Sequence, residues 1–198
     1  MFPAFLSPAR CLVLTAGLLV AVVSPAQRCV VRLSGVVTEH FTGDPLRNAV
    51  VRVLKAGNPV AEVVTRNNGR YAFELDRGWR YTVYYSRKGM VTKHVVIDTQ
   101  GIPPYPDVPF YEMDVQMTLF GWIADFDLSA FDQALGEAAY APGLRNMSWD
   151  VPYTEELRPE LSRVMTEYEK TAKGYYARKR AGRRPQDLPV PGAGAPTR

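Results

Sequence analysis

Short segments in which apolar and polar residues alternate recur along the chain from Val30 to Leu119, and they constrain the fold more than any other feature. The clearest segment starts at Tyr111, where five apolar residues alternate with four polar ones. Alternation with a period of two is typical of a strand that buries one face and leaves the other in water. Turn signals separate the segments, among them Asn67-Asn68-Gly69, which favours a tight hairpin. The pattern predicts a small antiparallel β-sandwich.

We expect seven strands in this sandwich, which should occupy residues 28–120. The predicted strands are 30–39, 48–55, 60–66, 70–75, 79–86, 91–97 and 111–119. In the fifth strand, Trp79, Tyr81 and Tyr85 share the face that is predicted to lie in the core together with Tyr111. A loop rich in proline, 101–109, leads to the last strand.

The residues after Phe120 are predicted to form a cover for the sandwich, followed by loops, over 121–153. Trp122, Ile123, Phe126 and Phe131 follow one another too closely for a solvated linker. We expect these side chains to cover an edge or an open end of the sandwich.

A helix is predicted over residues 154–182, because apolar residues recur there at spacings of three and four. Thr154 is the expected N-cap; in the alternative, Pro159 marks the first turn and the helix starts at about Arg158. Residues 183–198 consist of proline, glycine and charged residues, so we expect a disordered basic tail. The whole is predicted to be a mainly β chain with a C-terminal amphipathic helix.

The first residues resemble a secretory signal. Arg10 precedes an apolar run from Cys11 to Val23, and Ala26 offers a small residue at a cleavage point. The run is shorter than the roughly 20 residues that a transmembrane helix needs. We therefore expect residues 1–26 to be a signal peptide, and the protein to be secreted across the inner membrane, periplasmic or associated with the outer membrane. Cleavage would leave Cys29 as a single thiol without an internal disulfide.

Five runs of residues resemble the carboxypeptidase regulatory-like domains, which are transthyretin-like, Ig-like β-sandwiches of secreted and envelope proteins in bacteria. They are Ser34-Gly35-Val36-Val37, Thr42-Gly43-Asp44-Pro45-Leu46, Asn48-Ala49-Val50-Val51-Arg52-Val53, Asn68-Gly69-Arg70-Tyr71-Ala72-Phe73 and Tyr81-Thr82-Val83. The resemblance covers roughly residues 32–119. It implies an accessory or interaction role beside other proteins, and it brings no catalytic residues.

The chain offers few residues for chemistry. His40 and His94 are its two histidines. A related transthyretin-like enzyme hydrolyses 5-hydroxyisourate with histidines, an arginine and a C-terminal Tyr-Arg-Gly-Ser, whereas this chain ends in Ala195-Pro196-Thr197-Arg198. The aspartates between 125 and 132 lack the glycine and the final glutamate of a calcium loop. We predict no enzyme activity, no metal site and no cofactor.

Two features are candidates for binding. Tyr84 and Tyr105 are the aromatic residues that alternation leaves outside the core, and aromatic faces stack on sugars or anchor protein partners. The basic cluster at the end of the predicted helix could attract anionic lipid or an acidic partner. Its residues are Arg178, Lys179, Arg180, Arg183 and Arg184.

The sequence therefore predicts a non-enzymatic adaptor of the bacterial cell envelope that binds a partner protein. The alternatives are a carbohydrate-binding module that uses exposed aromatics and an enzyme similar to 5-hydroxyisourate hydrolase. Contact with anionic lipid or glycan stays open, and no nucleic acid is expected as a partner.

Overall fold

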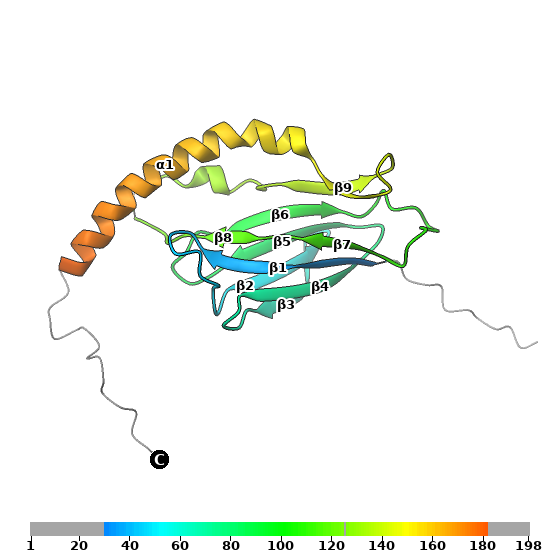
Figure 1. Cartoon of the computed structure of the whole chain (residues 1–198), viewed down its shortest axis with the longest axis horizontal. Coiled ribbons are helices and arrows are strands. Elements are labelled where there is room, and N and C mark those ends of the chain that lie inside the picture. Colours follow the sequence, from blue (N-terminus) through cyan, green and yellow to red (C-terminus); the bar gives the residue numbers. More distant parts are fainter. Residues whose placement is uncertain (1–29, 125, 182–198) are drawn as a thin grey trace, which may run out of the picture.

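The structure, a computed structural model, describes residues 30–124 and 126–181 (Figure 1). In this part of the chain two β-sheets pack against each other, and one long helix lies above them. The elements are β1 (Val30–Glu39), β2 (Val50–Lys55), β3 (Asn58–Val64), β4 (Arg70–Asp76), β5 (Arg80–Ser86), β6 (Lys93–Asp98), β7 (Phe110–Asp114), β8 (Met117–Leu119), the 3₁₀-helix η1 (Ser129–Phe131), β9 (Glu137–Ala141), β10 (Asn146–Trp149) and α1 (Val151–Ala181). The predictions for residues 1–26 and for Cys29 lie outside the described residues.

The two sheets differ in size, and both contain parallel strand pairs. The smaller sheet has the order β4-β1-β7, with β8 also paired to β1, and the larger has the order β10-β9-β6-β5-β2-β3. β7 and β8 run parallel to β1, and β9 runs parallel to β6. The predicted mainly β chain with two sheets and a C-terminal helix is confirmed. The prediction of seven antiparallel strands is wrong, because the described chain has ten strands and three of them reach a parallel partner through connections other than hairpins.

The predicted strand 111–119 is divided into β7 and β8 at Val115. The backbone NH of Val115 donates to the carbonyl of Ser34, and its carbonyl accepts the hydroxyl of buried Tyr71 at 2.7 Å. The same carbonyl lies so close to Gly35 that a Cβ at Gly35 would be 2.0 Å from the oxygen. Buried and exposed residues still alternate through β7 and β8, so the prediction failed only on the continuity of the strand.

The main core lies between the sheets and is built from the inward faces of their strands. Tyr81, Tyr85 and Tyr111 are buried there as predicted, but the side chain of Trp79 is 43% exposed. Trp79 lies in the turn from β4 and precedes β5, so the alternation of β5 does not extend to it. The hydroxyls of Tyr71 and Tyr85 are 2.8 Å apart inside this core.

The segment predicted as loops before the helix contains β9 and β10. β9 adds to the larger sheet beside β6, and β10 forms an antiparallel hairpin with β9. Ala138 of β9 and Met147 of β10 are buried in the main core. β9 is short and rich in alanine, so its sequence carries no signal with a period of two.

α1 begins at Val151, before the predicted start at Thr154. The carboxylate of Asp150 accepts the backbone NH of Tyr153 at 3.0 Å, so Asp150 is the N-cap. Pro159 lies inside α1 rather than in its first turn. The sequence pattern therefore did not identify Asp150, whose short polar side chain caps α1.

α1 is described up to Ala181. The predicted tail 183–198 lies outside the described residues. Within residues 30–124 and 126–181, no helix combines the length and the apolar character that crossing a membrane requires.

A second hydrophobic cluster attaches α1 to the sandwich. The ring of buried Tyr168 lies 4.5 Å from that of Phe120, and its hydroxyl donates to the carbonyl of Gly121 at 2.6 Å. Trp122 is 58% exposed and stays outside the cluster, contrary to its predicted role in the cover. The predicted aromatic cover thus fills the space between the sandwich and α1. The buried members are Val91, Phe120, Ile123, Ala130, Phe131, Val164, Tyr168 and Ala172.

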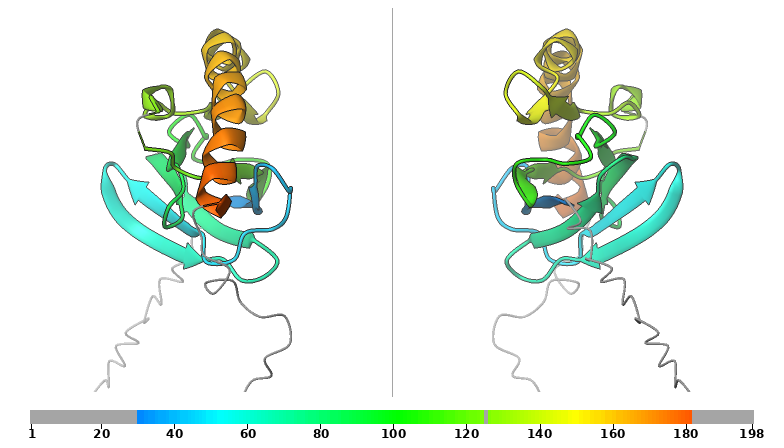
Figure 2. Two further views of the ribbon diagram at one scale, coloured as in Figure 1. Left: turned by 90° about the vertical axis from the view of Figure 1, so that its left-hand side faces the viewer. Right: turned by 90° about the vertical axis from the view of Figure 1, so that its right-hand side faces the viewer.

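The helix leaves one flank of the sandwich uncovered. Figure 1 shows α1 arching above β9 and reaching past β8. Figure 2 shows β2 and β3, in cyan, on the flank of the sandwich away from α1. β3 is the last strand of the larger sheet, so its outer edge and the neighbouring sheet face remain accessible.

Candidate binding surface

Four side chains form a row across the outer face of the larger sheet. They are Glu62 on β3, Arg52 on β2, Tyr84 on β5 and His94 on β6, and each is the register partner of the next. The Nε of Arg52 donates to Glu62 at 2.7 Å. The rings of Tyr84 and His94 stack with their centroids 4.9 Å apart. We call these four residues the cross-strand row.

The aromatic half of the row is partly shielded from water. Tyr84 was predicted to be exposed, but it is half-buried, and its ring lies against His94. Burial lowers the pKa of His94, while the negative charge of Asp132 opposes this change. A lowered pKa favours the neutral imidazole at neutral pH. This half of the row therefore presents stacked rings rather than a cation.

An open hollow of about 470 Å³ lies beside the row. Its lining combines an aliphatic floor with hydroxyl groups and one guanidinium, which suits contact with side chains of a partner. The lining residues are Arg52, Leu54, Pro59, Tyr84, Ser86 and Thr92.

The free edge of β3 borders the same face. β3 pairs only with β2 among the described strands, and its Val60 and Val64 are 54% and 53% exposed. An edge strand carries backbone donors and acceptors without partners along one side. Pro59 and a break in register beside it interrupt the start of this edge, whereas the pairing from Ala61 to Val64 is regular. The regular part is open to pairing with another extended chain.

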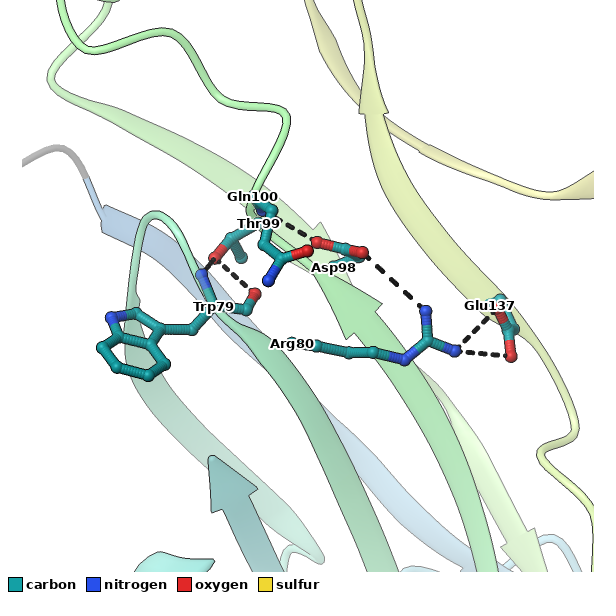
Figure 3. A network of polar contacts seen from close by, with 6 residues as sticks. All are labelled: Trp79, Arg80, Asp98, Thr99, Gln100 and Glu137. Atoms are coloured by element: carbon teal, nitrogen blue, oxygen red, sulfur yellow. Dashed lines mark hydrogen bonds and ion pairs between the residues drawn. The ribbon is translucent and has the colours of Figure 1, made fainter. Parts of the chain in front are cut away.

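A second polar group lies farther along the larger sheet (Figure 3). A terminal guanidinium nitrogen of Arg80 donates to both carboxylate oxygens of Glu137, at 2.9 and 3.1 Å, and Arg80 also lies 3.8 Å from Asp98. These contacts join β5 to both β6 and β9. Arg80 lies between two carboxylates, so this group joins β9 to the sheet rather than offering a free cation.

Trp79 stands next to this group as an exposed indole with a fixed backbone. The hydroxyl of buried Thr99 accepts the backbone NH of Trp79 at 3.0 Å, and the NH of Thr99 donates to the carbonyl of Trp79 at 2.8 Å (Figure 3). The Nζ of Lys55 lies 4.1 Å from the centroid of the indole. Sequence reasoning missed this exposed aromatic residue because it assigned Trp79 to the core.

The predicted pair of exposed aromatics is not brought together. Tyr105 is 91% exposed in the loop between β6 and β7. Tyr84 lies opposite His94 of β6. His94 is four residues, or about 13 Å along the strand, from the end of β6 at Asp98. The two tyrosines therefore cannot form one stacking platform, and Tyr105 lies at the same end of the sandwich as Trp79.

The structure does not place the side chains of the predicted basic cluster. The helix α1 includes Arg178, Lys179 and Arg180, but only their backbone is described. Arg183 and Arg184 lie outside the described residues altogether. The predicted attraction of this cluster for anionic lipid stays a prediction.

The two histidines contact different partners. The Nε2 of His40 lies 2.9 Å from a carboxylate oxygen of Glu169 on α1, whereas His94 belongs to the cross-strand row. No group of three or more His, Cys, Asp or Glu side chains gathers into a possible metal site in the described part of the chain.

Residues 32–105 match the model of the carboxypeptidase regulatory-like domain family. The resemblance seen in the sequence motifs is confirmed over these residues. The match starts within β1, includes β2 to β6, and ends before β7. The strands from β7 to β10 and the helix α1 lie beyond it.

The similarity to other known proteins is low. A search of curated proteins finds no match to this chain. The solved structures that are similar to part of this chain include three enzymes. They are 3-chlorocatechol 1,2-dioxygenase from Rhodococcus opacus (13% identity, TM-score 0.35, 47% of this chain and 60% of that one), chlorocatechol 1,2-dioxygenase from Pseudomonas putida (12%, 0.37, 48% and 61%) and 5-hydroxyisourate hydrolase from Klebsiella pneumoniae (19%, 0.32, 47% and 89%). The chain spans about 60% of the length of the two dioxygenases.

The sequence pattern identified Tyr84 as a candidate for binding but not Glu62, Arg52 or His94, which lie in the same row. The sequence did contain a signal for the cross-strand row, because residues of opposite charge or aromatic character lie at outward positions of consecutive predicted strands. The register that aligns these four residues could not be predicted from the sequence, because it depends on turn geometry and on a bulge between β2 and β3.

Proposed function

We propose, starting from the carboxypeptidase regulatory-like domain that residues 32–105 match, that the protein is a non-enzymatic interaction module of the cell envelope. It binds a partner protein by pairing the edge of β3 with an extended segment of that partner. The envelope location rests on the predicted signal peptide at 1–26, which lies outside the described residues.

The observation that carries this proposal is the uncovered edge of β3 beside the cross-strand row. Val60 and Val64 are apolar side chains that are more than half exposed on a strand with one unpaired side. An added strand would gain backbone hydrogen bonds from the edge and side-chain contacts from the outer face. Both sources of affinity are therefore present in one place.

The other sheet edges support such pairing less well. β4 ends the smaller sheet, but its outward residues Arg70, Glu74 and Asp76 are charged and exposed. Charges along an edge strand oppose pairing with a further strand. β7, the other edge of the smaller sheet, carries the charged and exposed Glu112 and Asp114. β10, which ends the larger sheet on the other side, has only four residues. β3 is the longest edge with apolar exposed side chains.

Affinity capture from envelope extracts tests the proposal when it compares variants. The full chain should retain a partner that protects the amides of β3 from hydrogen exchange. The double variant Val60→Asp, Val64→Asp should lose at least about 90% of the captured partner, because it places charges along the edge. Leu144→Asp, at an exposed residue of the β9–β10 turn, is the matched control and should bind normally.

Two results would contradict the proposal. One is equal capture by the wild type and by the double aspartate variant. The other is hydrolysis of 5-hydroxyisourate by the purified chain, which would show that the module is an enzyme.

Binding of glycans is the second candidate, and the exposed aromatics at one end of the sandwich favour it. Trp79 and Tyr105 lie in the turn before β5 and the loop after β6, at the ends where Arg80 pairs with Asp98. Exposed aromatic faces can stack on sugar rings. A glycan array should then give hits that Trp79→Ala and Tyr105→Ala abolish, while Tyr84→Ala leaves them intact. An array without hits removes this candidate.

A further inference from the structure

We infer that the partner segment carries a basic residue beside Glu62 and an apolar residue beside Val64. This inference rests on the proposed docking at the β3 edge and names the chemistry of the occupant. It follows from the side chains that an added strand would meet on the outer face of the larger sheet.

Glu62 and Val64 share the outer face of β3. Their register partners are Arg52 and Val50, and pairing is regular over this stretch. Side chains of an added strand on the same face would lie directly beside them, because neighbouring strands place paired residues side by side. Two partner residues separated by one position therefore define the specificity.

Glu62 keeps one carboxylate oxygen for a partner. The Nε of Arg52 is bonded to Oε2 of Glu62 at 2.7 Å, and this bond directs the carboxylate along the outer face. A lysine or arginine beside Glu62 would contact the other oxygen from the open side. An acidic residue there would face a like charge, and directly opposed like charges destabilise a strand pair.

The charges beyond Val64 have the opposite sign and fix the register. Arg47 and Arg66 line a hollow together with Val64 and Thr65. A basic residue of the partner is thus attracted beside Glu62 and repelled if the segment slips toward Arg66. The apolar residue between these charges meets Val64, which is half exposed and offers a dry contact.

Synthetic peptides and the full chain test this inference. The probes are capped nine-residue peptides of Thr that carry Lys, Glu or Gln at the central position and Val two positions away on the same face. Both orders of the basic and apolar positions are used, because the direction of the added strand is part of the outcome. Affinity is measured by titration, and amide shifts in NMR spectra locate the peptide on β3.

The Lys peptide should bind about three- to tenfold more tightly than the Glu peptide, with the Gln peptide between them. The preference should shrink at high salt, because the pair lies at the surface. The double swap Arg52→Glu, Glu62→Lys keeps the pair within the sheet but reverses the outward charge, so it should invert the preference. The matched control is the swap Arg32→Glu, Glu74→Arg on the smaller sheet, whose pair is 3.6 Å apart, and it should leave the preference unchanged.

The possible failures are distinguishable. Equal affinity for the Lys and Glu peptides, with shifts on β3, overturns the inferred partner chemistry and leaves the edge docking intact. The absence of shifts on β3 with every peptide overturns the docking itself. If the control swap inverts the preference between the Lys and Glu peptides, the peptide lies on β4. This result overturns both the partner chemistry and the docking at β3.

Discussion

The main core and the cluster under α1 are built by different means, although both consist of buried apolar side chains. The main core draws on strands that alternate inward and outward residues, and its polar groups bond to one another. The cluster under α1 draws on an irregular segment and on one face of a helix, and it borders a buried lysine. The first can form wherever sheets stack, whereas the second exists only after the sandwich has formed. We therefore expect the helix to depend on the sandwich but the sandwich to tolerate loss of the helix.

Gly35→Ala should break the main core and give the largest effect. Its Cβ would lie 2.0 Å from the carbonyl oxygen of Val115, which is backbone and cannot move away cheaply. We expect a loss of about 4 kcal/mol or more in the free energy of unfolding, with α1 lost together with the sheets. Urea unfolding followed by circular dichroism measures it. Gly143→Ala, where an added Cβ meets nothing within 4 Å, should be nearly neutral, and equal stability of the two variants would refute the expectation.

Tyr168→Ala should break the second cluster alone. It removes a buried ring that contacts Phe120 and a hydroxyl bonded to Gly121, at a cost of about 3–4 kcal/mol to the docking of α1. Hydrogen exchange should then show lost protection in α1 and unchanged protection in β1 and β4. Tyr168→Phe, which keeps the ring, should retain most of the docking. If α1 and the strands lose protection together, the two clusters form one cooperative unit.

Lys93→Met should stabilise the protein at neutral pH. Burial lowers the pKa of Lys93 from 10.5 to about 8, although its ammonium donates to the carbonyl of Thr118 and lies 4.6 Å from the ring of Phe120. The unfolded chain therefore holds more protons than the folded one between pH 8 and 10.5, and the stability of the wild type rises with pH across this window. The variant should gain up to roughly 3 kcal/mol at pH 7 and should lack that rise.

Chemical unfolding at pH 7 and at pH 10 checks this prediction. A variant that is less stable than the wild type at pH 7 would show that the contacts of the ammonium outweigh its desolvation. Lys88→Met, at an exposed neighbouring lysine, is the control and should change neither value.

Tyr71→Phe should weaken the main core by the smallest of these amounts. It leaves the carbonyl of Val115 without its 2.7 Å bond and the hydroxyl of Tyr85 without its 2.8 Å partner. We expect a loss of about 1–3 kcal/mol, because buried polar groups without partners retain their desolvation cost. Thermal unfolding measures it. A neutral result would mean that water replaces the lost hydroxyl.

The strands in which apolar and polar residues alternate were predictable, and the strands without this alternation were missed. β1, β2 and β4 carry enough β-branched and aromatic residues at every second position to define a buried face. β9 and β10 lack that pattern and fold as strands because β6 offers an edge beside the core. Trp79 was misplaced because the alternation was extended one residue beyond the start of β5.

The candidate surface shows the same division. Tyr84 could be named from the sequence, since alternation turns it away from the core. Its alignment with Arg52 and His94 needs the register of three strands, and a shift by one residue would reverse the faces. The exposure of Val64 could not be predicted either, because it depends on β3 being the last strand of its sheet.

By itself the sequence predicted strands over residues 30–119, a helix after them, and a resemblance to one domain family over roughly 32–119, of which the family model matches 32–105. These features are local, since they depend on spacing and turn residues within a few positions of one another. Tertiary structure alone decided which strands pair, which edge stays open and where α1 docks. Those outcomes depend on contacts between residues far apart in the chain, where the burial of one surface is set by another that the local pattern does not encode.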